Sequence, residues 1–470
     1  MKEHAKKNQP APYASLNIFL CACILFMFAS TTQATELEYQ DKQALHDIQQ
    51  QISATRIEQD IRKLVSFGTR HTLSETQSDT RGIGAARRWI KSEFDNISKA
   101  CGGCLKVYFQ SQTIQGEKRI PDATEVISVI AVQTGNTDPN RFVMMSGDID
   151  SRISDVMNFT DDSPGANDNA SGVAGTLEAA RVLSQYKFNG SVVYAALAGE
   201  EQGLFGGKIL AEAAQKQGWR LKAVLNNDMI GNIAGINGVI NNTTARIFAE
   251  GTRHTETDAE ARSRRYTGGE VDSPSRNLAR YIDLMADRYI PNLDTMVVYR
   301  LDRFGRGGHH RPFNDLGYPG VRIMETNEHY ERQHQDLRVE DGVIYGDTID
   351  GVNFDYAAKL TSLNAVSLAG MAWAPSPPIE VSIKGAVQPS TTLSWATLDK
   401  NQNNQLTGYK IYWRYTDAPQ WQFSKFVGNV TQYTLDNVVI DNYFFGVASV
   451  SKEGFESPVV FPGAAGAFGE

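Results

Sequence analysis

The chain has 470 residues, of which 41% are hydrophobic and 21% are charged, and its formal net charge is −8. This is the composition of an ordinary globular protein, and the length exceeds what a single hydrophobic core usually holds, so we expect two domains. The acidic balance argues against nucleic acid and against an anionic membrane as partners.

Residues 1–34 have the pattern of a signal peptide. Lysines near the start precede an apolar run over residues 18–29, and small residues around Ala34 offer a cleavage site. The run is too short to span a bilayer comfortably, and an uncleaved membrane anchor is the alternative. We therefore expect a secreted or periplasmic protein with no stable membrane association after the signal is removed.

Two helices are expected next, over residues 41–64 and 82–97, because apolar residues recur there at helical spacing. The second helix is followed by Cys101 and Cys104. In an oxidising compartment this pair is expected to form a local disulfide. A zinc knuckle would need a second cysteine pair, and a redox-active motif would need its own strand–helix setting.

From residue 125 onward, apolar runs alternate with amphipathic segments. This alternation predicts an α/β domain, an α/β/α sandwich in which a mostly parallel central sheet lies between two layers of helices. The expected strands cover residues 125–132, 141–146, 191–198 and 221–227, and the expected helices between them cover residues 172–186 and 203–217.

Residues 232–306 form an insertion of mixed character. Its segment 252–265 is highly charged and is expected to be a solvated loop, whereas residues 275–289 have a helical pattern. A closing helix is expected over residues 353–373, and it completes a first domain that spans residues 41–374.

The pattern changes after residues 375–378, which contain three prolines and predict a linker. Residues 379–470 have short alternating strands separated by polar turns, which predicts a small all-β sandwich. Its aromatic residues, among them Trp395 and Tyr443, resemble the core and the tyrosine corner of a fibronectin type III domain. Such a module would offer a contact to a surface or a polymer.

Acidic residues follow three of the predicted strands of the first domain. Asp148 and Asp150 follow one strand, Glu200 and Glu201 a second, and Asp228 a third. Because the carboxyl ends of parallel strands meet at one edge of a sheet, these side chains are expected to share a site. Taken singly, such residues are more often caps or parts of solvated turns.

Two further segments offer metal-ligating side chains. Asp168 precedes a predicted helix, where it would either cap that helix or bridge two cations with its two oxygens. His310 follows two glycines that let the backbone approach a site closely, and histidine is the commonest zinc ligand. His329 and His334 are further candidates for contacts to a substrate.

The chain resembles the zinc aminopeptidases of metallopeptidase family 28. The segments PGANDNASG and AGEEQGLFG match the family pattern closely, and the resemblance covers most of residues 41–374. The resemblance implies a phosphorylase/hydrolase-like α/β/α fold and two co-catalytic metal ions. By position it makes Glu200 the general base and Asp150 a residue behind the ligands, and it implies a cis peptide bond after Asp168. The implied metal ligands are Asp148, Asp168, Glu201, Asp228 and His310.

Two positions depart from the family pattern, although together they conserve charge. Asp148 stands where the family has histidine, and His309 stands where it has aspartate. The first metal ion would then have only oxygen ligands, which favours manganese, magnesium or calcium, while the second keeps a zinc-like set. The protein is therefore expected to hold one or two zinc ions, or to be an inactive relative.

Together these features predict an exported metal-dependent exopeptidase. It would be an aminopeptidase that removes amino-terminal residues from peptides, with metal-activated water and Glu200 as the base. A glutaminyl-cyclase-like enzyme on the same fold is one alternative. A catalytically degenerate protein that binds a surface or a polymer through its C-terminal module is the other.

Overall fold

The computed structural model describes residues 41–397 and 405–468. Residues 1–34, the expected signal peptide, lie outside the described residues, so that expectation stays a prediction. Among the described residues, no helix is both long and apolar enough to cross a membrane.

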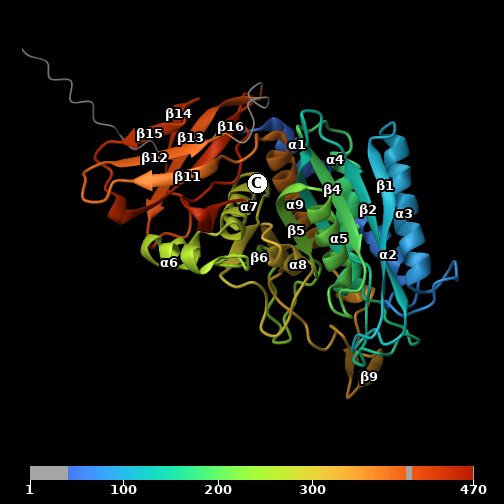
Figure 1. Ribbon diagram of the computed structural model, residues 1–470. Helices are drawn as coiled ribbons and strands as arrows, with labels where there is room; N and C mark the ends of the chain where they lie inside the picture. Colours follow the sequence, from blue (N-terminus) through green and yellow to red (C-terminus); the bar gives the residue numbers. More distant parts are fainter. Residues whose placement is uncertain (1–40, 398–404, 469–470) are drawn as a thin grey trace, which may run out of the picture. The chain divides into compact units, whose positions relative to one another are not determined.

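The first part of the chain is built on an eight-stranded sheet with the order β1-β2-β4-β3-β5-β8-β6-β7 (Figure 1). The four central strands β4, β3, β5 and β8 are parallel neighbours, and antiparallel pairs lie only toward the two sides. The mostly parallel sheet is therefore confirmed. Its strands are β1 (Leu105–Ile114), β2 (Thr124–Gln133), β3 (Asp138–Asp148), β4 (Gly190–Leu197), β5 (Arg220–Asn227), β6 (Thr244–Ala249), β7 (Asp294–Val298) and β8 (Gly320–Glu325).

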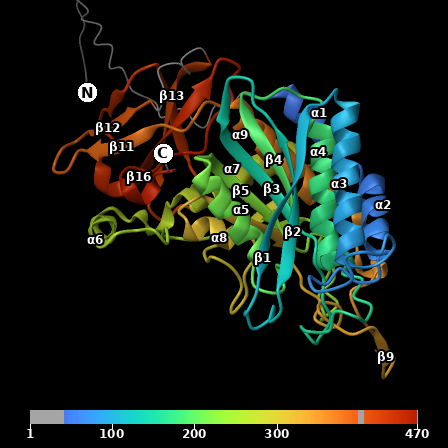
Figure 2. The ribbon, with the colours of Figure 1, turned by 45° about the vertical axis from the view of Figure 1, so that its right-hand side comes forward.

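Helices cover both faces of this sheet. Successive residues of a strand point to opposite faces, so neighbouring residues belong to different cores. In β3, Met145 joins the core under α2, α3, α4, α7 and α9, while Met144 joins the core under α5 and α8. Figure 2 shows α2, α3 and α4 together on one side of the sheet, and the α/β/α arrangement is confirmed. The helices are α1 (Gln43–Gln51), α2 (Ala54–Val65), α3 (Gly82–Ala100), α4 (Gly172–Leu183), α5 (Phe205–Lys216), α6 (Asp258–Thr267), α7 (Pro274–Tyr289), α8 (His310–Asp315) and α9 (Phe354–Trp373).

Two local expectations need correction. The single helix expected over residues 41–64 is two helices, because Ser53 caps α2 and its Oγ accepts a hydrogen bond from the first turn. The loop expected over residues 252–265 contains the start of α6, where Thr257 and Glu260 form a capping box. No residue of α6 is buried, so no apolar periodicity could reveal this helix.

Residues 379–468 contain two three-stranded antiparallel sheets (orange to red in Figure 1), with the orders β11-β12-β15 and β14-β13-β16. Trp395, Tyr409 and Phe445 lie in the core of this small sandwich. The likeness to fibronectin type III and the boundaries at residues 375–378 stay predictions. The strands are β11 (Ile379–Lys384), β12 (Thr391–Ala396), β13 (Leu406–Tyr415), β14 (Phe423–Gly428), β15 (Gln432–Leu435) and β16 (Tyr443–Ser451), and they follow a short hairpin of β9 (Arg338–Glu340) and β10 (Val343–Tyr345).

Asp272 is a buried carboxylate that pairs with two arginines. It is 0% exposed and lies 2.8 Å from Arg280 in α7 and 2.8 Å from Arg414 in β13. We expect Asp272→Asn to lower the free energy of unfolding by about 3–5 kcal/mol, because two buried guanidinium groups then lack their counter-ion. Denaturation midpoints measure this loss. Asp79→Asn, at a pair whose aspartate is 93% exposed, is the control and should leave the midpoints unchanged; equal effects of the two variants would contradict the expectation.

Candidate metal centre

The acidic residues after β3 and β4 come together because these two strands are parallel neighbours. Asp150, after β3, accepts hydrogen bonds from the backbone N–H groups of Glu200 and Glu201, at 3.1 and 3.0 Å. Thr72 donates a third hydrogen bond to the same carboxylate, at 3.1 Å. Asp150 therefore fixes the backbone that carries both glutamates.

Asp168 lies in a tight turn, η1 (Ala166–Ser171), just before α4, and the backbone angles of Asp168 and Asn169 are non-helical. Its peptide bond to Asn169 is cis, as the family resemblance implies. The backbone N–H groups of Asn167 and Asp168 donate to the carboxylate of Asp347, at 2.9 and 2.6 Å. Asp347 thus holds the turn in place, and no sequence pattern had pointed to it.

Asp168, Glu201 and His334 each place one ligand atom within 4.8 Å of the others. His334 Nε2 lies 2.9 Å from Asp168 Oδ2 and 2.8 Å from Glu201 Oε1. Burial disfavours the imidazolium, yet the two carboxylates outweigh it and raise the pKa of His334 to about 9, so this group attracts positive charge strongly. Two carboxylates and one imidazole are a donor set that fits zinc.

Glu200 lies beside this group in a cavity of about 750 Å³, which Asp168, Glu201 and His334 also line. Burial raises the pKa of Glu200 well above its usual range, and neighbouring carboxylates, Glu201 above all, raise it further. A carboxylate of this kind next to a cation site is suited to accept a proton from water. The cavity is also lined by the cations Arg119, Arg152, Lys208, Arg303, Arg306 and Arg311.

Comparison with known proteins identifies the family. Residues 128–340 match peptidase family M28. A probable zinc metalloprotease of Leptosphaeria maculans is 41% identical over 414 residues, which cover 88% of this chain and 95% of the relative. Another, of Pyrenophora teres f. teres, is 40% identical over 415 residues, which cover 88% of this chain and 85% of the relative. The chain belongs to peptidase family M28.

Solved structures show the same fold. The LapA aminopeptidase of Legionella pneumophila is 19% identical to this M28 peptidase, with a TM-score of 0.52 and coverage of 78% of each chain. LapB of Legionella pneumophila is 20% identical, with a TM-score of 0.50 and coverage of 70% of this chain and 75% of that chain. The α/β/α fold that we expected from the segments PGANDNASG and AGEEQGLFG is therefore confirmed.

His310, which we expected to bind a metal ion, is not part of the group of Asp168, Glu201 and His334 that could hold one. It begins α8, is buried, and its Nε2 lies 2.8 Å from the carbonyl oxygen of Leu301 and 3.7 Å from Asp302. His334, in the loop after β8, completes the group instead. The sequence suggested His334 only as a contact to a substrate, because Arg322 interrupts the apolar run of β8 and no strand was expected whose end would point to it.

Asp148 and Asp228, the other two expected ligands, are already engaged by neighbouring side chains. Asp148 Oδ2 accepts a hydrogen bond from Asn169 Nδ2 at 2.7 Å, and Asp228 Oδ2 lies 2.7 Å from Arg322 Nη2. Within residues 41–397 and 405–468, no group of three clustered ligands includes either aspartate. Among the described residues, the expected all-oxygen ligands Asp148, Asp168 and Asp228 are therefore not brought together as one such group.

The two departures from the family pattern are neighbours in space. His309 Nε2 lies 3.6 Å from Asp148 Oδ1, and its Nδ1 accepts a hydrogen bond from the backbone N–H of Gly207 at 3.1 Å. Burial lowers the pKa of His309 to about 3, so the ring is neutral beside the aspartate. His309 therefore supports Asp148 and the start of α5 from behind the cavity.

The buried neutral state of His309 predicts a loss of stability in acid. The unfolded chain takes up the proton near pH 6.5 and the folded protein only near pH 3, so the contribution of His309 is complete above pH 6.5 and is lost as the pH falls toward 3. In His309→Asn, whose side-chain oxygen can accept the Gly207 hydrogen bond, the thermal midpoint should fall less steeply over this range. Equal slopes in the variant and the wild type would contradict the assignment.

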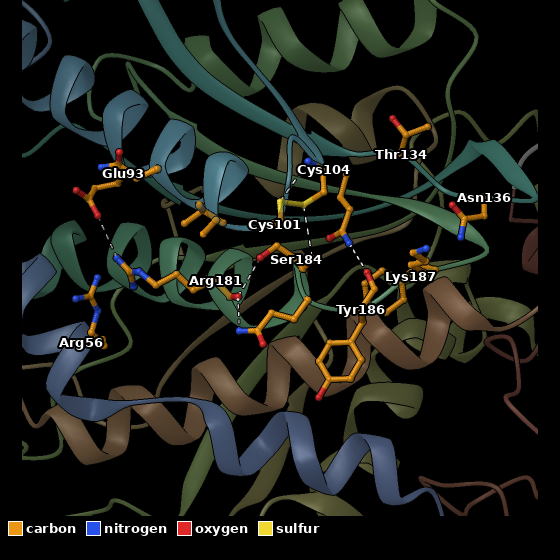
Figure 3. A pocket seen from close by; sticks show the side chains of 16 residues that line it. Arg56, Glu93, Cys101, Cys104, Thr134, Asn136, Arg181, Ser184, Tyr186 and Lys187 are labelled. Carbon is orange, nitrogen blue, oxygen red and sulfur yellow. Dashed lines mark hydrogen bonds and ion pairs between the residues drawn. A yellow bond between two sulfur atoms is a disulfide. The ribbon is translucent and has the colours of Figure 1, made fainter.

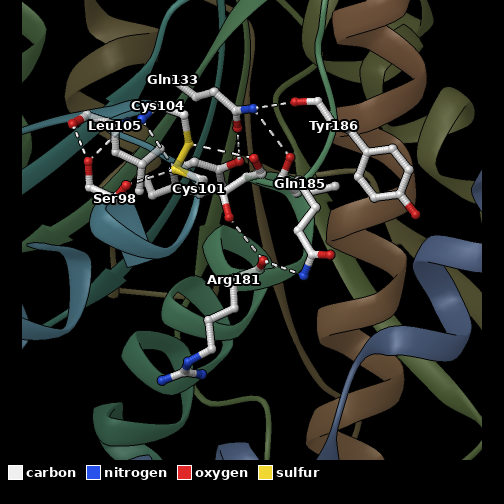
Figure 4. Close-up of a disulfide and its surroundings, with 11 residues drawn as sticks. Ser98, Cys101, Cys104, Leu105, Gln133, Arg181, Gln185 and Tyr186 are labelled. Atoms are coloured by element: carbon white, nitrogen blue, oxygen red, sulfur yellow. Dashed lines mark hydrogen bonds between the residues drawn. A yellow bond between two sulfur atoms is a disulfide. The ribbon is translucent and has the colours of Figure 1, made fainter. Parts of the chain in front are cut away.

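Cys101 and Cys104 form a disulfide in the turn between α3 and β1 (Figure 4). It borders a second cavity, of about 830 Å³ (Figure 3). This cavity shares no lining residue with the first. Arg181 in this cavity lies 3.6 Å from Glu93 and 2.6 Å from Asp60. The charged residues that line this cavity are Arg56, Glu93, Arg181 and Lys187, and they include no cluster of carboxylates like that around Glu200.

Proposed function

We propose that this protein is an exported zinc-dependent aminopeptidase. The observation that carries the proposal is the group of Asp168, Glu201 and His334 with Glu200 beside it. Relatives that are 40% and 41% identical are named probable zinc metalloproteases, which supports zinc as the ion. Peptides are the proposed substrates.

A zinc ion bound by Asp168, Glu201 and His334 would supply Lewis acidity, which polarises the scissile carbonyl and acidifies water. Glu200 takes a proton from the attacking water and delivers it to the nitrogen of the departing amine. Asp150 keeps Glu200 in place through its backbone N–H, 3.1 Å away. Arg152 Nε, 2.7 Å from Glu201 Oε2, orients that ligand.

Two further parts of the proposal concern the ends of the chain. Residues 1–34 would direct export to the periplasm or the medium, because lysines, an apolar run and small residues follow one another there. Residues 379–470 would form a fibronectin type III-like module that contacts a surface or a polymer, since their aromatic residues match the core of such a sandwich.

The test is hydrolysis of aminoacyl-anilides and of peptides, with the products identified by mass spectrometry. We expect stepwise loss of amino-terminal residues from free peptides, no loss from acetylated ones, and no activity after chelation until zinc is restored. A peptide with amino-terminal glutamine that loses ammonia but no residue would identify the cyclase alternative. Zinc-loaded protein that converts none of these substrates would favour the degenerate binding protein.

A further inference from the structure

Arg322 is an arginine in the middle of the central sheet. It lies in β8 opposite Asn226 of β5 and is 0% exposed. Its Nη2 is 2.7 Å from Asp228 Oδ2, and its Nη1 is 3.2 Å from Asp302 Oδ2 and 2.7 Å from the carbonyl oxygen of Gly307. These contacts fix the guanidinium between two carboxylates.

The guanidinium faces the carboxylate that a first metal ion would need. Asp228 lines the same cavity as Asp168 and Glu200. A guanidinium stays protonated at every pH at which proteins work, so Asp228 has a permanent counter-charge. The side chain of Arg322 is fully buried, so water does not screen its charge, and a divalent ion bound to the same carboxylate would be repelled at short range. Arg152, which contacts Glu201, differs because its side chain is 16% exposed and it lies against Oε2, which leaves Oε1 beside His334.

Asp148, the other ligand expected for a first metal ion, is hydrogen-bonded to Asn169. Asn169 Nδ2 donates to Asp148 and to the carbonyl oxygen of Asn227, at 2.7 Å each, while Asn169 Oδ1 accepts from the backbone N–H of Met229 at 3.2 Å. Asp148 thereby anchors the turn that carries Asp168. Its position in the sequence matches a metal ligand, but its contacts are those of a positioning residue.

We propose that this protein uses a single metal ion, bound by Asp168, Glu201 and His334, and that the guanidinium of Arg322 takes the electrostatic place of a second ion beside Asp228. The inference rests on the proposed function, which needs at least one ion. Arg322 is a positioning residue in this arrangement: it holds Asp228 and offsets the negative charge that surrounds Glu200.

The first measurement is the number of ions per chain, by elemental analysis after equilibration with excess zinc and removal of free metal. We expect one ion in the wild type, one in Asp228→Asn and none in His334→Ala. Two ions in the wild type, or none in folded Asp228→Asn, would overturn the inference and leave the proposed function standing. A wild type that binds no ion would refute both.

Arg322→Ala tests the role of the guanidinium directly. The substitution frees the oxygens of Asp228 and removes its counter-charge, so a second equivalent of zinc or manganese should bind. Arg303→Ala is the matched control, because Arg303 lines the cavity and lies 3.5 Å from Asp302 but is not paired with Asp228. It should keep one equivalent. If Arg322→Ala and Arg303→Ala both bound one metal ion per chain, the proposal that the Arg322 guanidinium takes the place of a second ion would be refuted.

Arg322→Lys covers the case in which Arg322→Ala does not fold. Lysine keeps a positive charge near Asp228, and we expect a folded protein that binds one ion per chain, with circular dichroism as the check on folding. A second equivalent in Arg322→Lys would show that the charge at this position does not exclude an ion, and the inference would fall.

Discussion

Glu200→Gln is expected to lower kcat by about 10²- to 10⁴-fold, because an amide cannot accept the proton of the attacking water. The metal content should stay at the wild-type level, since Glu200 is not among the three clustered ligands. Steady-state kinetics on an aminoacyl-anilide, with elemental analysis of the same preparation, measure both quantities.

Glu201→Gln is the matched control for this prediction. Glu201 Oε1 lies 2.8 Å from His334 Nε2, within the ligand group, so its replacement should weaken metal binding as well as activity. If Glu200→Gln lost the metal while Glu201→Gln kept it, the roles of the two glutamates would be exchanged.

His334→Ala is expected to remove the bound ion and to lower activity by more than about 100-fold, because loss of a ligand should cost more than loss of a residue behind one. Competition for zinc with a chromophoric chelator gives the affinity. His310→Ala is the comparison, since both positions are histidines near the cavity and only His334 belongs to the ligand group. Retention of zinc by His334→Ala and its loss from His310→Ala would restore the original ligand assignment.

The parts of the site that could be predicted from the sequence depend on local order along the chain. Asp150, Glu200 and Glu201 follow buried apolar strands, and parallel pairing of β3 with β4 places such residues together. Asp168 lies in the most distinctive motif of the chain. The sheet and its helices could be predicted for the same reason, because alternating apolar patterns determine them.

The rest depends on contacts between distant segments, which no local pattern records. His334 lies in the loop after β8, a strand whose apolar pattern Arg322 interrupts. That His334 lies beside Glu201 can be seen only in the folded chain. Asp148 is a ligand by position, but Asn169 engages it and His309 lies behind it. The charge that Arg322 places beside Asp228 also arises between strands, from residues 94 positions apart.

The pairing of Arg322 with Asp228 makes part of this site independent of metal supply. An ion must be captured from the surroundings, in competition with other molecules, and a chelator can take it away. The guanidinium of Arg322 is a covalent part of the chain, so no chelator removes it. In the folded protein it lies 2.7 Å from the carboxylate of Asp228. Scarcity of metal therefore leaves this charge untouched and acts only on the cluster of Asp168, Glu201 and His334.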